Sequence, residues 1–354
     1  MKRYERANIA AMQGYVPGKQ PLSAEAIKLN TNENPYPPCA AVMDALQAIA
    51  GDALRRYPPP TADELRGVIA AIHGVQLEQV VAVNGGDELL RLALTTFVDP
   101  GVPIGILEPS YSLYPVLAEV HGSPVVRVAA EPDWSPPPDL GARMQGAGVK
   151  LLLLVNPHAP SGQLTTAAQL ARIASAFDGV LLVDEAYVDF VDPELGHDAV
   201  SLLSAHDNVL LLRTLSKGYS LAGLRVGYGL GAASLIAPLL WKTRDSYNVD
   251  AVAQRLATAA LRHRSAAAET WRKVREERAR LQAALAALGF AVAPSQTNFL
   301  LARVPAGASA PELLRRLEQR GVLVRYFDAP RLDDALRITV GSPEQNDRLL
   351  SALG

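Results

Sequence analysis

Cysteine is almost absent from this sequence: Cys39 is the only one among 354 residues. One thiol cannot form a disulfide within the chain and cannot build a metal site from several thiolates. The six histidines also lack the spacing that would place two metal ligands on one helix. We therefore expect no bound metal ion, and we expect the protein in a reduced compartment, the cytoplasm.

Neither sign of charge is in excess, and no long apolar segment occurs. Lysine and arginine together number 34 against 36 aspartates and glutamates, which gives a formal net charge of −2. A general nucleic-acid binder needs a basic footprint, which this balance does not offer. A membrane-spanning helix needs about eighteen or more apolar residues in a row, and the N-terminal stretch has no apolar core of signal-peptide length. We expect a soluble protein without nucleic-acid or membrane partners.

What is present is a series of short apolar runs, most of them followed by a stretch with helical spacing, such as residues 87–97 and 166–177. Continuous apolar runs suit strands that are buried on both faces of a mostly parallel sheet. Their alternation with helices predicts an open α/β sandwich. The predicted strands cover residues 80–83, 103–107, 124–128, 150–155, 180–183, 209–212 and 225–230.

The pattern changes near residue 232. Sequence rich in alanine, arginine and glutamate continues to Gly289 and predicts long helices with a break near 247–249. Apolar runs and amphipathic stretches then alternate to the end of the chain, which indicates a smaller α+β module. We predict an N-terminal arm (1–30), a large α/β domain (31–246) and a small C-terminal domain (247–354). The small domain should contain strands over 299–304, 322–327 and 336–341, and helices over 311–320 and from Pro343.

Polar motifs follow the predicted strands where ligands bind in open α/β sheets, beyond the carboxyl ends. Each motif alone has a plainer explanation, such as a tight turn, a helix cap or a solvated lysine. Together they match one ligand, pyridoxal phosphate (PLP), which needs a lysine for its aldehyde, a carboxylate for its ring nitrogen, and hydroxyls, backbone N–H groups and an arginine for its phosphate. The motifs are Asn84-Gly85-Gly86-Asp87, Glu108-Pro109-Ser110-Tyr111, residues 156–162, Asp184-Glu185-Ala186-Tyr187, and residues 213–219 with Arg225.

The sequence resembles the fold-type I PLP-dependent aminotransferases, and among them the histidinol-phosphate aminotransferases. The resemblance runs in family order from near residue 15 to the C-terminus. It implies a mostly parallel seven-stranded sheet between helices, with a smaller α+β C-terminal domain. The matching stretches are LNTNENPYPP (29–38), RRYPPP (55–60), NGGDELL (84–90), EPSYSLY (108–114), NPHAPSG (156–162), VDEAYVDF (183–190), RTLSKGYSLAGLRVGY (213–228), TNFLL (297–301) and LRITVGSPEQND (336–347).

The resemblance also implies roles around the cofactor. Lys217 would bond to the aldehyde and carry a proton during the reaction, while Asp184 would keep the ring nitrogen protonated. Tyr187 would hydrogen-bond the ring hydroxyl and Tyr111 would stack on the ring. The cofactor phosphate would be held by Gly86, Asp87, Thr214, Ser216 and Arg225.

Further implied roles concern the substrates and a second subunit. Tyr57 would reach the phosphate bound in the neighbouring subunit, so we expect a homodimer with shared active sites. Tyr15, Arg325 and Arg337 would bind the phosphate of histidinol phosphate, and Arg337 also a carboxylate of glutamate or 2-oxoglutarate. The implied reaction belongs to histidine biosynthesis. The alternatives are an aminotransferase for aromatic amino acids and a lyase that decarboxylates threonine phosphate on the same fold.

One loop departs from the family pattern. The family usually has an asparagine directly before Pro-Thr-Gly, and this asparagine donates to the ring hydroxyl beside Tyr187. Here the position is Ala159, and Ser161 replaces the threonine. We predict that Asn156 or His158 supplies the missing donor or that the donor is not replaced, and we include Asn156 among the cofactor contacts.

Overall fold

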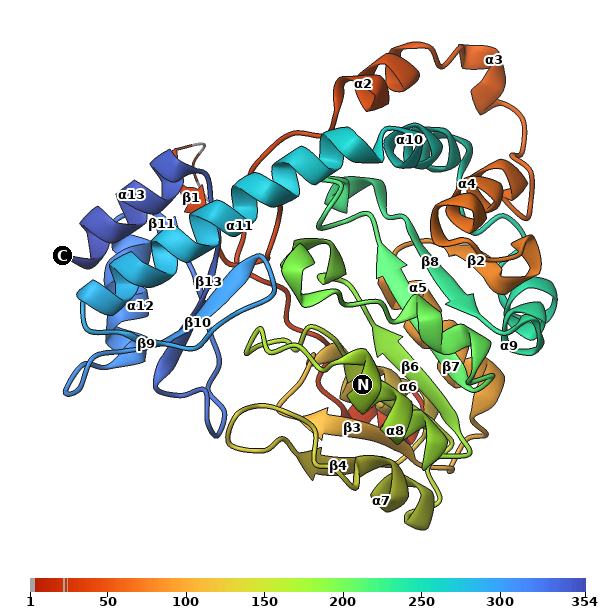
Figure 1. Cartoon of the computed structure of the whole chain (residues 1–354), viewed down its shortest axis with the longest axis horizontal. Coiled ribbons are helices and arrows are strands. Elements are labelled where there is room, and N and C mark those ends of the chain that lie inside the picture. Colours follow the sequence, from red (N-terminus) through yellow and green to blue (C-terminus); the bar gives the residue numbers. More distant parts are fainter. Residues whose placement is uncertain (1–3, 22, 24) are drawn as a thin grey trace.

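The computed structural model describes residues 4–21, 23 and 25–354. A seven-stranded sheet with helices on both sides forms the large domain, and a four-stranded antiparallel sheet lies in the small domain (Figure 1). The strand order of the large sheet is β2-β8-β7-β6-β5-β3-β4. Only β8 runs antiparallel to its neighbours β2 and β7. The strands are β2 (Val80–Val83), β3 (Ile104–Glu108), β4 (Val125–Ala129), β5 (Leu151–Val155), β6 (Val180–Asp184), β7 (Val209–Thr214) and β8 (Gly227–Gly231).

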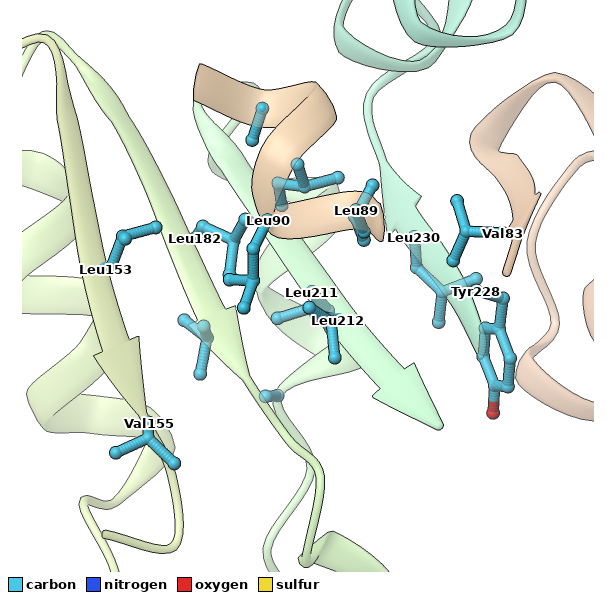
Figure 2. Packing of buried hydrophobic residues seen from close by; sticks show 14 of the residues in the cluster. Val83, Leu89, Leu90, Leu153, Val155, Leu182, Leu211, Leu212, Tyr228 and Leu230 are labelled. Carbon is cyan, nitrogen blue, oxygen red and sulfur yellow. The ribbon is translucent and has the colours of Figure 1, made fainter. Parts of the chain in front are cut away.

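All seven predicted strands of this sheet are confirmed. The central strands are apolar along their whole length because helices cover both faces of the sheet. Every residue of β2 and of β5 is buried. Figure 2 shows leucines of neighbouring strands, among them Leu182 and Leu211, packed together with Leu89 and Leu90 of the helix that follows β2. This packing holds the carboxyl ends of the parallel strands at one edge of the sheet.

The helices of the large domain connect and flank these strands. Those predicted over 87–97 and 166–177 are present as α5 (Gly86–Phe97) and α8 (Ala167–Ser175). The break predicted near 247–249 is confirmed, because the chain is not helical between the π-helical turn at Leu239–Thr243 and α10 (Ala251–Arg262). The others are α1 (Ala7–Ala11), α2 (Ala40–Gln47), α3 (Gly51–Leu54), α4 (Asp63–His73), α6 (Leu113–His121), α7 (Leu140–Gly146) and α9 (Ala233–Pro238).

The small domain includes part of the N-terminal arm. Strand β1 (Ile27–Lys28) pairs in parallel with β11 (Val322–Leu323), and Ile27 is buried in the small core. The run predicted as one strand over 322–327 is two strands, since β12 (Arg325–Tyr326) pairs with β13 in the other sheet. The remaining elements are α11 (Arg264–Ala287), β9 (Ala291–Val292), β10 (Phe299–Arg303), α12 (Ala310–Gln319), β13 (Ala335–Thr339) and α13 (Pro343–Leu353).

Helix α11 packs into the cores of both domains. Trp271 and Val274, on the first half of α11, pack into the core of the large domain. Leu281 and Leu285, on its second half, pack into the core of the small domain. The helix runs without interruption from one domain to the other (Figure 1). A helical pattern alone does not reveal that its apolar face changes partner along its length.

Arg278, on α11, forms hydrogen bonds with residues of both domains. Its buried guanidinium donates to the carbonyl oxygen of Phe190 (2.9 Å) and to that of Thr297 (2.9 Å), and it forms an ion pair with Asp192 (2.8 Å). We expect Arg278→Met to lower the free energy of unfolding by about 3 kcal/mol, because it leaves buried acceptors without donors. Urea unfolding followed by circular dichroism measures the change.

The control is Arg272→Met on the same helix. Arg272 forms ion pairs only at the exposed surface, where such pairs contribute little. Equal effects of the two substitutions would contradict a bridging role for Arg278.

Candidate active site

A cavity of about 390 Å³ lies beyond the carboxyl ends of the parallel strands, with walls from both domains. Its volume is in the range of small-molecule sites. Every predicted site residue except Asn156 and Tyr57 lines it. These residues are Tyr15, Gly86, Asp87, Tyr111, Asp184, Tyr187, Thr214, Ser216, Lys217, Arg225, Arg325 and Arg337.

Asp184 places a carboxylate at the buried end of β6. One oxygen accepts a hydrogen bond from the hydroxyl of Tyr114 (2.9 Å), and the other accepts from the backbone N–H of Ala186 (3.1 Å). Burial raises the pKa of Asp184 to about 6. A cationic group bound in the cavity beside this carboxylate would favour its ionised form. Tyr114 lies in the stretch EPSYSLY, but its contact with Asp184 was not predicted. A tyrosine at this position can equally be buried as part of the apolar face of a helix, so its residue type does not indicate a polar role.

Lys217 places the amine of a half-buried side chain in the same cavity. It follows β7, and its Nζ donates to the backbone carbonyl of Thr31 at 2.7 Å. Burial, together with the positive charge of Arg337, lowers the pKa of Lys217 to about 8. A larger fraction of this amine is therefore neutral near pH 7 than of an exposed lysine, and a neutral amine is the nucleophilic form.

An anion site lies where α5 begins. Gly85 has a φ of +76°, and a Cβ at this position would be 2.6 Å from Nη2 of Arg225. Glycine thus permits the guanidinium to approach the helix N-terminus, whose free N–H groups attract anions. The hydroxyl of Ser216 lies 3.4 Å from Nη1 of Arg225, and the hydroxyl of Thr214 lies 2.9 Å from that of Ser216. A guanidinium, two hydroxyls and a helix N-terminus together suit a phosphate group.

The small domain supplies a second group of cations. Arg325 and Arg337 are paired residues on the neighbouring strands β12 and β13. Arg337 is half-buried; it donates through Nη2 to the carbonyl of Asn30 (3.1 Å), and its buried Nε has no partner among the described residues. Arg325 donates to the carbonyls of Val16 and Pro17, next to Tyr15. The three predicted substrate residues therefore meet at one wall of the cavity.

The side chain of Asn156, which was predicted to contact the cofactor, forms its hydrogen bonds within the protein. Its amide donates to the carbonyl of Thr165 (3.0 Å) and accepts from the N–H of the same residue (2.8 Å), and it does not line the cavity. The two ring nitrogens of His158 also form hydrogen bonds within the protein, one with the hydroxyl of Ser161 (2.7 Å) and one with the carbonyl of Pro109 (2.9 Å). Ala159 lines the cavity and offers no side-chain donor.

Asn32 is a site residue that sequence reasoning missed. Its side-chain amide donates to the hydroxyl of Tyr187 at 2.9 Å. It lies in the quoted stretch LNTNENPYPP, but that stretch shows neither helical nor strand periodicity. Nothing in its local sequence indicates a contact with a residue 155 positions away.

Tyr57 lies on the surface of the large domain. Its side chain is 80% exposed and stacks on Tyr247, with ring centroids 4.3 Å apart. Tyr247 is also exposed. The expected contact of Tyr57 with a second subunit stays a prediction.

The residues present fit PLP. An amine, a buried carboxylate, a phenol and an anion site surround one cavity, and these groups match the aldehyde, the ring nitrogen, the ring hydroxyl and the phosphate of that cofactor. The buried hydroxyl of Ser110, which has no hydrogen-bond partner within the described part of the chain, also lines the cavity and can bind a polar ligand. Within the described part of the chain, no three His, Cys, Asp or Glu side chains gather as they would around a metal ion. Nor does any described helix combine the length and apolar character needed to cross a membrane.

Comparison with known proteins gives the family. The class I and II aminotransferase family matches residues 24–353, and the chain belongs to this family. Its relatives include histidinol-phosphate aminotransferase 1 of Nostoc sp., 42% identical over all of this chain and 98% of the relative. The histidinol-phosphate aminotransferase of Synechocystis sp. is 43% identical over 98% of this chain and 97% of its own.

A solved structure agrees with these relatives. The histidinol-phosphate aminotransferase of Sinorhizobium meliloti in complex with pyridoxal-5'-phosphate superimposes with a TM-score of 0.90. It is 25% identical in sequence, and the match covers 100% of this chain and 97% of that one. The predicted fold type is therefore confirmed.

Proposed function

We propose that the protein is a PLP-dependent aminotransferase that transfers the amino group of L-histidinol phosphate to 2-oxoglutarate. The products would be imidazole acetol phosphate and glutamate, in histidine biosynthesis. The observation that carries this proposal is the presence of two separate cationic groups in one cavity. Arg225 at the start of α5 suits the cofactor phosphate, and Arg325 with Arg337 suits a phosphate on the substrate. The relatives named as histidinol-phosphate aminotransferases support the same reading.

Each residue around the cavity would have its own role in the reaction. PLP, when bound, supplies a ring that accepts the electrons left when the substrate loses its α-proton. Asp184 would hold a proton at the ring nitrogen, and Tyr187 would donate to the ring hydroxyl. The amine of Lys217 would hold the cofactor's aldehyde carbon and would carry a proton during the reaction. Tyr111 covers the ring, and the donors at α5 and Ser216 fix the phosphate.

A panel of amines tests the substrate. Histidinol phosphate, phenylalanine, tyrosine and threonine phosphate would each be supplied with 2-oxoglutarate, and glutamate and CO₂ would both be measured. We expect glutamate from histidinol phosphate with the highest kcat/KM. A higher kcat/KM for phenylalanine or tyrosine would favour the aromatic aminotransferase, and CO₂ from threonine phosphate without need of 2-oxoglutarate would favour the decarboxylase.

The pKa of Lys217 leads to a pH dependence. We expect the rate at which PLP adds to the cofactor-free protein to rise with pH, with a midpoint near 8, because only the neutral amine attacks an aldehyde. Arg337→Met removes a positive charge that favours the neutral form, so its midpoint should lie higher. Stopped-flow absorbance of the cofactor measures the rate. A midpoint near that of a free lysine in the unaltered protein would contradict the assignment.

The proposed homodimer shares its active sites through Tyr57. A Tyr57→Ala variant and a Lys217→Ala variant, each weakly active, would be unfolded together and refolded. Each mixed dimer would then contain one site with both residues intact, so we expect activity of about a quarter of the unaltered enzyme from an equal mixture. Activity equal to the average of the separate variants would contradict shared sites.

A further inference from the structure

The hydroxyl of Tyr187 accepts a hydrogen bond from a residue far away in the sequence. The family's asparagine is replaced by Ala159, and neither Asn156 nor His158 turns toward the cavity. Asn32 is the residue that contacts the phenol oxygen. It is 1% exposed, lines the cavity and has a φ of +57°. Asparagine tolerates this left-handed conformation better than most residues, so the backbone and the contact favour the same side chain.

A second contact fixes which way the amide of Asn32 points. The backbone N–H of Asn32 donates to the hydroxyl oxygen of Thr339 at 3.0 Å. That hydroxyl in turn lies 3.1 Å from Oδ1 of Asn32 and donates its hydrogen there. With Oδ1 held by Thr339, the amide NH₂ faces Tyr187, 2.9 Å away.

The direction of this hydrogen bond determines what Tyr187 can do. An amide NH₂ only donates, so the oxygen of Tyr187 is the acceptor. Its own hydrogen finds no acceptor among the described residues, and the side chain lines the cavity. The phenol is therefore left free to donate to a ligand.

We propose that Asn32 is a positioning residue that orients the O–H of Tyr187 toward the ring hydroxyl oxygen of the cofactor. The O–H of Tyr187 is thereby aimed at the ring oxygen as a hydrogen-bond donor. Ala159, at the family's asparagine position, offers no side-chain donor. The proposal rests on the proposed binding of PLP. Asn32 acts through Tyr187, so its effect should disappear when Tyr187 cannot donate.

The test uses the cofactor-loaded protein and the pH dependence of its visible absorbance, which reports the proton shared between the ring oxygen and the nitrogen of Lys217. A donor to the ring oxygen favours the deprotonated form, so its loss raises the midpoint. We expect Asn32→Gly, which keeps the left-handed backbone without strain, to raise the midpoint by about one pH unit. In a Tyr187→Phe background the same substitution should cause no further shift.

Thr339→Val is a second variant that keeps the side-chain shape and leaves Asn32 in place. It removes the hydroxyl that orients the amide, and we expect a smaller shift in the same direction. An unchanged midpoint in Asn32→Gly, or an equal shift with and without Tyr187, would overturn the proposal. An unaltered protein without borohydride-sensitive visible absorbance would instead overturn the cofactor assignment, so the two failures are distinguishable.

Discussion

Replacing Lys217 by alanine is expected to lower the turnover of transamination by at least about 10³-fold, because the substitution removes both the nucleophilic amine and the group that carries the proton. The position of the amine in the cavity and its lowered pKa single it out among the lysines. Steady-state kinetics measures the loss. Borohydride treatment followed by mass spectrometry should add the cofactor to the peptide that contains Lys217 in the unaltered protein, and to no peptide of the variant.

Lys150→Ala is the matched control. The Lys150 side chain is exposed at the far end of the sheet, directly before β5, and we expect unchanged turnover and labelling. Recovery of the label on another lysine, or turnover retained by the Lys217 variant, would refute the assigned role.

Replacing Asp184 by asparagine is expected to lower turnover by about 10²–10³-fold, in the range seen when a preorganised electrostatic group is removed from an active site. A neutral amide cannot balance a protonated ring nitrogen, so the ring would withdraw electrons less strongly. The proposed phosphate-binding residues Arg225 and Ser216 are unaltered in this variant, so cofactor affinity should fall much less than turnover. Equilibrium titration with PLP and kinetics on the same preparation separate the two effects.

Asp184→Glu serves as the comparison because it keeps the charge and displaces it by one methylene. We expect it to retain more turnover than the asparagine variant. Equal turnover in both substituted proteins would indicate that geometry, and not charge, is what Asp184 provides.

Most residues of this site could be located from the sequence, because their polar side chains lie near the ends of strands that are recognisable as apolar runs. Seven apolar runs were recognisable as strands. Asp184 and Lys217 follow the ends of two of these runs, and Arg225 stands at the start of the last one, which is antiparallel to its neighbours. The carboxyl ends of parallel strands share one edge, so residues far apart in sequence could be placed together. Position along a strand is a local property, and local properties can be read from the sequence.

Side-chain directions and long-range partners could not be predicted from the sequence. Asn156 is in the expected loop, but its amide binds the backbone of Thr165, nine residues away, and a sequence pattern does not specify a rotamer. The contact between Asn32 and Tyr187 joins two segments that only tertiary structure brings together. Helix α11 has one continuous pattern although it packs into two cores, so the change of core could not be located from its periodicity.

In the proposed reaction, one cavity takes an amino group from histidinol phosphate and passes it to a keto acid. The most direct measurement is a half-reaction with cofactor-loaded protein and histidinol phosphate, in the absence of 2-oxoglutarate. We predict that the visible absorbance is lost and that about one keto product forms per active site; added 2-oxoglutarate then restores the absorbance and yields an equal amount of glutamate. Unchanged absorbance with histidinol phosphate, or release of CO₂ in place of a keto product, would contradict the account.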